Sequence, residues 1–285
     1  MKALLLATDL SNRSERALRR AAQLVRQFRC PWTVLHVVDA DQPQALAIAW
    51  SAQVHEALAS HLSEIAELAG AAPTLRIEVG DPAERIVDFA RSQGFDLLVM
   101  GCHRRNALRD VFVGTTLERV LRTGDTPVLV VNRETEGHYH DILIGLDLSP
   151  CSARAAQAAC ELGLLELARS RALYAFEPFA RLTLLGAGLS DSALEEHGQR
   201  EAVAARSALA QFLGEQGLLG VFSQHSAEEG LPITVLRRAL QQAEPDLLVL
   251  GTRGMGGIKR ALIGSVADAA LREFDCDMLV VPPAR

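Results

Sequence analysis

The chain alternates short continuous apolar runs with longer amphipathic stretches. Between the runs, segments such as Ser14–Phe28 and Ala83–Gln93 carry apolar residues at spacings of three and four, which is typical of helices with one buried face. Apolar strands joined by helices indicate parallel strands that are buried on both faces. The pattern therefore predicts an α/β three-layer arrangement. The expected strands of the first half are Ala3–Thr8, Thr33–Val38, Thr74–Val79, Asp96–Met100 and Val128–Val131.

The second half of the chain repeats the first. ALLLATDLS, which contains Asp9, recurs as ILIGLDLSP, which contains Asp147, and DLLVMG recurs as DLLVLG. Matched segments lie 138 residues apart early in each half and 150 apart later, so the second half carries 12 additional residues. We expect those residues within Pro178–Asp191. The repeat predicts two tandem domains, at residues 1–137 and 138–285, with the boundary in the polar stretch Asn132–His140.

The last strand of each half is rich in β-branched residues and, apart from Asp277, uncharged. These strands are TPVLVV and CDMLVV, at Thr126–Val131 and Cys276–Val281. They could be ordinary buried strands, or they could be sheet edges that invite pairing. We expect the two edges to meet each other, so that the halves form a pseudo-dimer around a shared two-fold axis. A homodimer of whole chains is a further candidate arrangement.

A glycine-containing segment follows the fourth strand of the second half. In open parallel sheets, ligands bind beyond the carboxyl ends of strands where the strand order reverses. Gly251 and Gly254 could allow the backbone to approach a ligand closely, or could take a positive φ. Gly264 precedes Ser265, which has capping-box spacing with Asp268 and is expected to open a helix. A helix start of this kind suits a phosphate, although an ordinary capped helix after a glycine-rich loop is the alternative.

The spacing Gly251-x2-Gly254-x9-Gly264-Ser265 resembles the nucleotide-binding motif of the universal stress protein family. The early aspartate of that family matches Asp147, and the resemblance covers nearly the whole chain twice. It implies two tandem α/β/α domains, each an open five-stranded parallel sheet of adenine-nucleotide α-hydrolase-like (flavodoxin-like) topology. Members with the motif bind ATP, so the resemblance implies an ATP site, with or without magnesium, in the second half.

The resemblance also implies roles for individual residues. Asp147 would face the adenine or its ribose, unless it only caps the next helix. The backbone around Ala175 would line the adenine pocket, and Arg253 would contact ribose and phosphates, unless it is a solvated loop charge. The start of the last helix would hold the phosphates. The implied nucleotide-binding residues are Leu146, Asp147, Ala175, Leu250, Gly251, Arg253, Gly254, Gly264, Ser265 and Val266.

The first half departs from the motif at one position. Arg104 stands where the family has its second glycine, and its side chain could fill the phosphate space. Alternatively, His103, Arg104 and Arg105 could form a different anion site. We expect that the first half is degenerate and does not bind a nucleotide, and hence that each chain binds one nucleotide, in its second half. The residues of the candidate degenerate site are Asp9, Val37, Gly101, Arg104, Gly114 and Thr115.

Charge and cysteine content narrow the function classes. The net charge of −6 argues against a nucleic-acid binder, which needs a broad basic surface. No apolar stretch reaches 18 residues and no signal peptide is recognised, so neither membrane nor secretion is expected. The five cysteines show no zinc spacing, which fits free thiols in the cytoplasm. Neither a P-loop nor a metal-binding pattern is found, and no catalytic residue stands out.

The resemblance favours a nucleotide-responsive stress or regulatory protein that acts on an unidentified protein partner. The alternatives are a slow ATPase or adenylylating enzyme that uses Asp147 and Arg253, and a pure interaction module without a nucleotide. The segment Pro178–Asp191 could be a lid over the second pocket, a partner-binding segment or a packed excursion.

Overall fold

A computed structural model describes residues 1–39, 52–60, 62, 72–102, 115–134, 137–177, 191–254 and 262–283. The strands are β1 (Leu4–Thr8), β2 (Trp32–Val38), β3 (Thr74–Val79), β4 (Leu97–Gly101), β5 (Val128–Val131), β6 (Asp141–Leu146), β7 (Arg169–Phe176), β8 (Gln224–Glu229), β9 (Leu247–Gly251) and β10 (Asp277–Val281). The helices with assigned bounds are α1 (Asn12–Phe28), α3 (Pro82–Gln93), α4 (Thr116–Thr123), α5 (Pro150–Glu161), α7 (Asp191–Glu215), α8 (Pro232–Ala243) and α9 (Ser265–Glu273).

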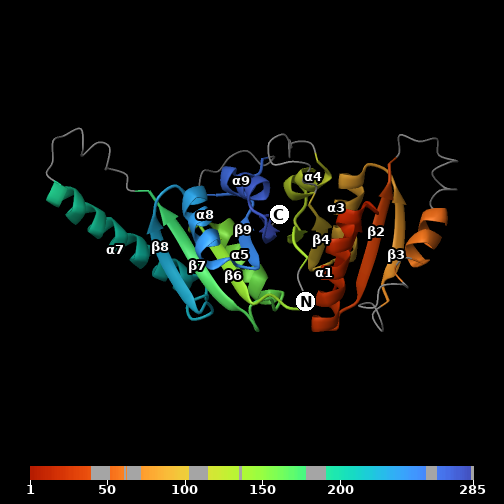
Figure 1. Cartoon of the computed structure of the whole chain (residues 1–285), viewed down its shortest axis with the longest axis horizontal. Coiled ribbons are helices and arrows are strands. Elements are labelled where there is room, and N and C mark those ends of the chain that lie inside the picture. Colours follow the sequence, from red (N-terminus) through yellow and green to blue (C-terminus); the bar gives the residue numbers. More distant parts are fainter. Residues whose placement is uncertain are drawn as a thin grey trace.

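All ten strands form one sheet in the order β3-β2-β1-β4-β5-β10-β9-β6-β7-β8 (Figure 1). Within each half the five strands are parallel, as the apolar pattern predicts. Their order is 3-2-1-4-5, with the third strand at the outer edge, whereas flavodoxin has the order 2-1-3-4-5. In both halves the strand order therefore reverses between the first and fourth strands.

The two halves are joined by antiparallel pairing of β5 with β10, which confirms the expected meeting of the last strands. Leu129 pairs with Leu279, and these two residues occupy corresponding positions of the repeat. The pseudo-two-fold axis therefore passes through this pair. We call the β5–β10 pairing the seam. The helices α4 and α9 lie beside each other near the seam, on the same side of the molecule (Figure 1). The hydrogen bond with Asp268 and, to a lesser extent, the charge of Glu118 in α4 raise the pKa of Arg272 in α9.

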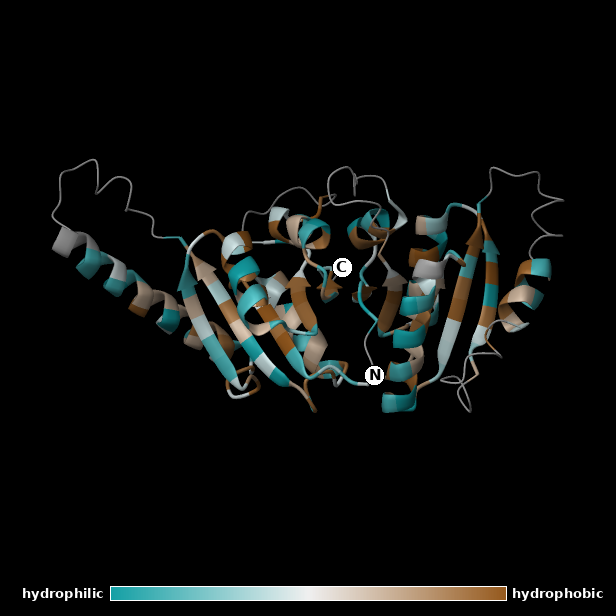
Figure 2. Ribbon diagram, in the orientation of Figure 1, coloured by the Kyte–Doolittle hydropathy of each residue, from teal (hydrophilic) through white to brown (hydrophobic). Residues whose placement is uncertain are grey.

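The core consists of one apolar layer on each face of the sheet. Successive strand residues point to opposite faces, so Leu4 and Leu6 belong to one layer and Leu5 to the other. The first layer packs against α1, α5 and α7, and the second against α3, α4, α8 and α9. Figure 2 shows the resulting pattern of hydrophobic strands and helices with hydrophilic outer surfaces. Burial on both faces explains why inner strands such as β4, β5 and β9 are continuous apolar runs, whereas the edge strands β3 and β8 are more polar and partly exposed.

Helix α7 follows the segment in which the additional residues are expected, and it extends away from the sheet beyond β8 (Figure 1). Residues 178–190, for which the sequence left a lid, a partner-binding segment and a packed excursion as alternatives, lie outside the described residues. Among the helices that the structure describes, none has the length and apolar character needed to cross a membrane.

Candidate functional site

A cavity of about 260 Å³ lies beyond the carboxyl ends of β6 and β9, where the strand order of the second half reverses. This is the place at which open parallel sheets bind ligands. All ten residues that the sequence predicts for the nucleotide site line it, together with Gly145, Ser152, Leu173, Pro232, Leu236, Leu262 and Ala267. The structure thus brings the predicted residues together from β6, β7, β9 and the start of α9.

Asp147 stands at the end of β6 in a tight turn. Its Oδ1 accepts a hydrogen bond from the backbone N–H of Ser149 at 3.1 Å, and Leu148 between them has the left-handed φ of 61°. The side chain of Ser149, not that of Asp147, caps α5 by accepting from the N–H of Ser152. The alternative in which Asp147 serves as the helix cap is therefore wrong, and the turn holds its carboxylate at the cavity instead.

Two glycines of the motif lie where an added Cβ would crowd other parts of the protein. A Cβ added at Gly254 would stand 2.6 Å from Oδ2 of Asp147, and one at Gly251 would stand 3.0 Å from backbone atoms of Cys151. Neither glycine has a positive φ. Of the two reasons that the sequence suggested, a positive φ is therefore wrong, and close approach of the backbone to a ligand stays a prediction. The neighbours that an added Cβ would meet within the protein are Asp147 and the start of α5.

The start of α9 differs from its sequence-based interpretation. The N-cap is Gly264, whose N–H donates to the carbonyl of Thr252 at 2.6 Å and whose carbonyl accepts from the N–H of Asp268 at 2.9 Å. Ser265 is already helical, so its hydroxyl does not cap the helix as the S-x-x-D spacing predicts. Gly264 offers no capping side chain, and among the described residues no side chain caps the first N–H groups of α9, which suits them to binding an anion.

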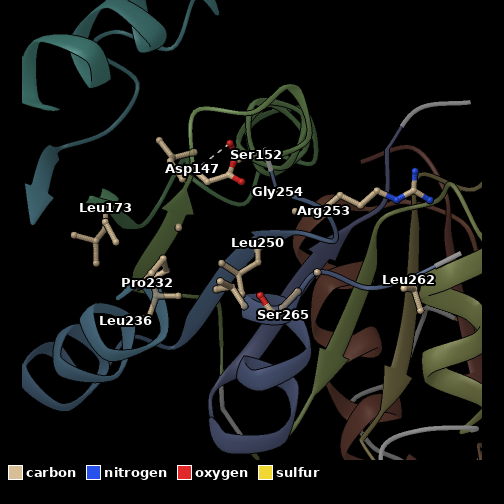
Figure 3. Close-up of a pocket in the computed structure, with 17 residues that line it drawn as sticks. Asp147, Ser152, Leu173, Pro232, Leu236, Leu250, Arg253, Gly254, Leu262 and Ser265 are labelled. Carbon is tan, nitrogen blue, oxygen red and sulfur yellow. Dashed lines mark hydrogen bonds between the residues drawn. The ribbon is translucent and has the colours of Figure 1, made fainter. Parts of the chain in front are cut away.

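The charges around the cavity are unevenly placed. The guanidinium of Arg253 points away from the carboxylate of Asp147 (Figure 3), although the residue itself lines the cavity. Asp268 in the first turn of α9 is held by two hydrogen bonds from Arg272, and the bond raises the pKa of that arginine. Its negative charge near the helix start is thereby compensated, which favours binding of an anion there.

Sequence reasoning missed the apolar wall opposite the glycine segment. Leu173, Pro232 and Leu236 close this side (Figure 3). Pro232 opens α8 after β8, at the position that corresponds to Pro82 in the first half. The recurrence of proline at these matched positions could have indicated the wall, because it places a helix start at the same strand end in both halves.

The first half has a corresponding cavity of about 420 Å³. Asp9, Val37, Gly101 and Thr115 line it as predicted, whereas Arg104 and Gly114 lie outside the described residues. Two differences from the second half are visible. The hydroxyl of Ser14 donates to Oδ1 of Asp9, whereas the corresponding Ser152 donates to a backbone carbonyl. Thr115 caps α4 by accepting from the N–H of Glu118 at 3.2 Å.

Metal-ligating side chains do not gather in either cavity. Within the described ranges there is no group of three or more His, Cys, Asp or Glu residues that could hold a metal ion. The polar side chains that the structure describes in the second-half cavity are those of Asp147, Ser152, Arg253 and Ser265, and the rest of the described lining is glycine or apolar residues.

Comparison with known proteins gives consistent matches. The family model "Universal stress protein family" matches residues 1–132 and 138–282. A universal stress protein of Mycolicibacterium smegmatis is 25% identical over 302 residues, covering 98% of this chain and 97% of the relative. One of Methanocaldococcus jannaschii is 40% identical over 58 residues, which cover 20% of this chain and 36% of that relative.

Among solved structures, a universal stress protein from Archaeoglobus fulgidus superposes with a TM-score of 0.71 at 18% identity, covering 99% of this chain and 98% of its own. That likeness shows a shared fold. The family model covers nearly the whole chain in two consecutive copies, and the chain therefore belongs to the universal stress protein family.

Proposed function

We propose that the second half binds one ATP per chain in the cavity beyond β6 and β9. The observation that carries this proposal is the start of α9, which no described side chain caps and whose first residues, Ser265, Val266 and Ala267, line the cavity. The N–H groups and the partial positive charge of such a helix start bind phosphates well. The backbone of Ser265 and Val266, together with the Ser265 hydroxyl, supplies the donors.

The remaining lining suits a nucleoside. Leu173, Ala175, Pro232 and Leu236 form an apolar surface for the base. The carboxylate of Asp147 lies across the cavity from Ser265 (Figure 3) and suits the ribose hydroxyls, which donate hydrogen bonds to it. A carboxylate would repel phosphates, so Asp147 and Ser265 together orient the ligand, with its ribose at Asp147 and its phosphates at Ser265.

The proposed role is that of a nucleotide-responsive regulatory protein. ATP binding stabilises the arrangement of Arg253 and Gly254 against Asp147 and the start of α9, and a protein partner distinguishes this form from the empty one. A ligand shifts such an equilibrium only as far as its affinities for the two forms differ. The partner therefore has to contact these residues or the helices beside them.

Calorimetric titration of the full chain with ATP, with and without magnesium, tests the proposal. We expect about one site per chain, together with a stabilisation of about 2.7 kcal/mol at a hundredfold excess over Kd. AMP and adenosine should bind more weakly, because they lack the phosphates that reach α9. Two equal sites per chain would contradict the assignment to the second half. No stabilisation by millimolar ATP would favour a module that binds partners without a nucleotide.

A further inference from the structure

An ion pair is completely buried in the seam between the two halves. Arg20 of α1 and Asp277 of β10 have side chains that are 2% and 0% exposed, and Nε of the arginine lies 3.5 Å from Oδ2 of the aspartate. Tyr139, in the connecting segment, donates to the same Oδ2 at 2.8 Å, and its ring lies 4.3 Å from the guanidinium carbon. One cation from the first half thus meets one anion from the second.

Backbone groups of the connecting segment complete this cluster. The N–H groups of Asn132 and Arg133 donate to Oδ1 of Asp277 at 2.8 and 3.1 Å, and Arg20 donates from Nη1 to the carbonyl of Gly137 at 2.8 Å. A buried charge is tolerated only where a partner charge and hydrogen bonds replace the lost water. Each charge therefore depends on the other half of the chain.

The pseudo-two-fold axis does not repeat this pair. In the matched numbering of the repeat, Ala158 of α5 corresponds to Arg20, and Pro127 before β5 corresponds to Asp277. Tyr139 corresponds to Met1. The first half therefore contributes only the cation and the second half only the anion.

The strands of the seam by themselves do not distinguish one half from the other. Val128, Leu129 and Val130 of β5 pair with Val280, Leu279 and Met278 of β10, and both sets are apolar and buried. Since Leu129 and Leu279 correspond in the repeat, β5 could pair with a second β5 in the same register. A seam between two first halves would bury Arg20 without a carboxylate, and a seam between two second halves would bury Asp277 without a cation.

We propose that the Arg20–Asp277 pair makes each half select the opposite half as its partner, rather than a second copy of itself. Selectivity of this kind comes from penalising the wrong pairing as well as stabilising the right one. The inference does not depend on nucleotide binding. It concerns which surfaces of this chain can associate while the chain folds, when β5 and β10 of neighbouring molecules are both exposed.

The substitution Leu129→Cys makes pairing between the β5 strands of two chains detectable as a disulfide. In the observed seam, residue 129 faces Leu279 and forms no disulfide. In a seam between two first halves it would face residue 129 of another chain, at a separation that a disulfide can span. The full chain with Leu129→Cys is refolded from denaturant, from micromolar to near-millimolar protein, oxidised mildly and examined for covalent dimers. The chain without Leu129→Cys gives the background of the native cysteines.

With Arg20 and Asp277 intact, we expect covalent dimers at the background level. Adding Arg20→Met with Asp277→Leu should raise the dimer fraction several-fold, increasingly with concentration. The control is Arg16→Met, which removes an exposed ion pair with Glu134 from the same helix and should leave the fraction unchanged. If the double variant does not refold, Arg20→Gln with Asp277→Asn also removes both charges and should raise the dimer fraction in the same way. A folded charge-free variant whose dimer fraction equals that of the reporter alone would overturn the proposal.

Discussion

Oδ2 of Asp147 lies against the backbone of Gly254 so closely that an added Cβ there would approach it to 2.6 Å. The end of β6 and the segment after β9 are therefore fitted to each other, and both line the cavity. The carboxylate of Asp147 is held by its hydrogen bond to the N–H of Ser149, which limits how far it can move away from Gly254. The second glycine of the motif is thus explained by this contact alone, before any ligand is considered.

The substitution Gly254→Ala should weaken ATP binding about tenfold, or about 1.4 kcal/mol, because the new Cβ displaces Asp147 or the segment itself. Calorimetric titration measures the loss. The matched control is Gly214→Ala in α7, where nothing lies within 4 Å of the added Cβ. Equal ATP affinities of both variants and the unmodified chain would show that the contact has no role in binding.

The hydroxyls of Ser265 and Thr115 should differ in their roles, although the two residues correspond in the repeat. Ser265→Ala should weaken ATP binding by about 1.5 kcal/mol and leave adenosine binding and Tm unchanged, since Gly264 is the N-cap of α9. Thr115→Ala should lower the free energy of unfolding by about 1 kcal/mol, since its Oγ1 caps α4. Titration and thermal unfolding of both variants test this contrast, and loss of stability in Ser265→Ala would contradict it.

Tyr139 should make the fold sensitive to alkaline pH. Burial, and then the neighbouring Asp277, raise the pKa of its hydroxyl well above the usual value. The unfolded chain therefore loses this proton near pH 10 while the folded chain keeps it, so stability is lost as the pH rises beyond that point.

Thermal unfolding from neutral pH to about pH 11 measures this alkaline loss. Tyr139→Phe removes the titrating group and should flatten the alkaline decline, although it lowers stability at pH 7 by breaking the hydrogen bond to Asp277. An equally steep decline in the Phe variant would assign the alkaline sensitivity to other groups.

Asp81 should contribute stability that acid removes. Its hydrogen bond from Arg119 lowers the pKa of the carboxyl below the usual value, and it also accepts from the N–H of Glu84 as the cap of α3. The contribution is complete above the unfolded pKa of about 3.9 and is lost as the pH falls through the lower folded value.

Asp81→Asn isolates the charge, because asparagine caps a helix as well as aspartate does. Its Tm should lie below that of the unmodified chain at pH 7, and the two should converge in acid. A constant difference across the acid range would show that the cap or local packing, rather than the ion pair with Arg119, accounts for the effect.

Local patterns were sufficient for the strands and for the plan of the site. Parallel strands buried on both faces are apolar throughout, and Val128–Val131 was found on this pattern with the bounds of β5. The edge strand β3 was also found with its bounds, Thr74–Val79, although it alternates between apolar and polar residues and is partly exposed. Matching two copies of one pattern then located Asp147 and Gly251 at neighbouring strand ends. These conclusions depend only on the identity and spacing of residues along the chain.

Contacts between distant segments decided the rest. That Gly254 accommodates Asp147, that Gly264 rather than Ser265 caps α9, and that Arg20 is neutralised by Asp277 each depend on atoms from separate elements. The sequence gives the chemical type of each residue, and the spacing of apolar residues indicates whether they form a helix or a strand. The distance between two elements does not follow from the sequence pattern, because it is set by the packing of the two apolar layers. For that reason these three relationships were visible only in the folded molecule.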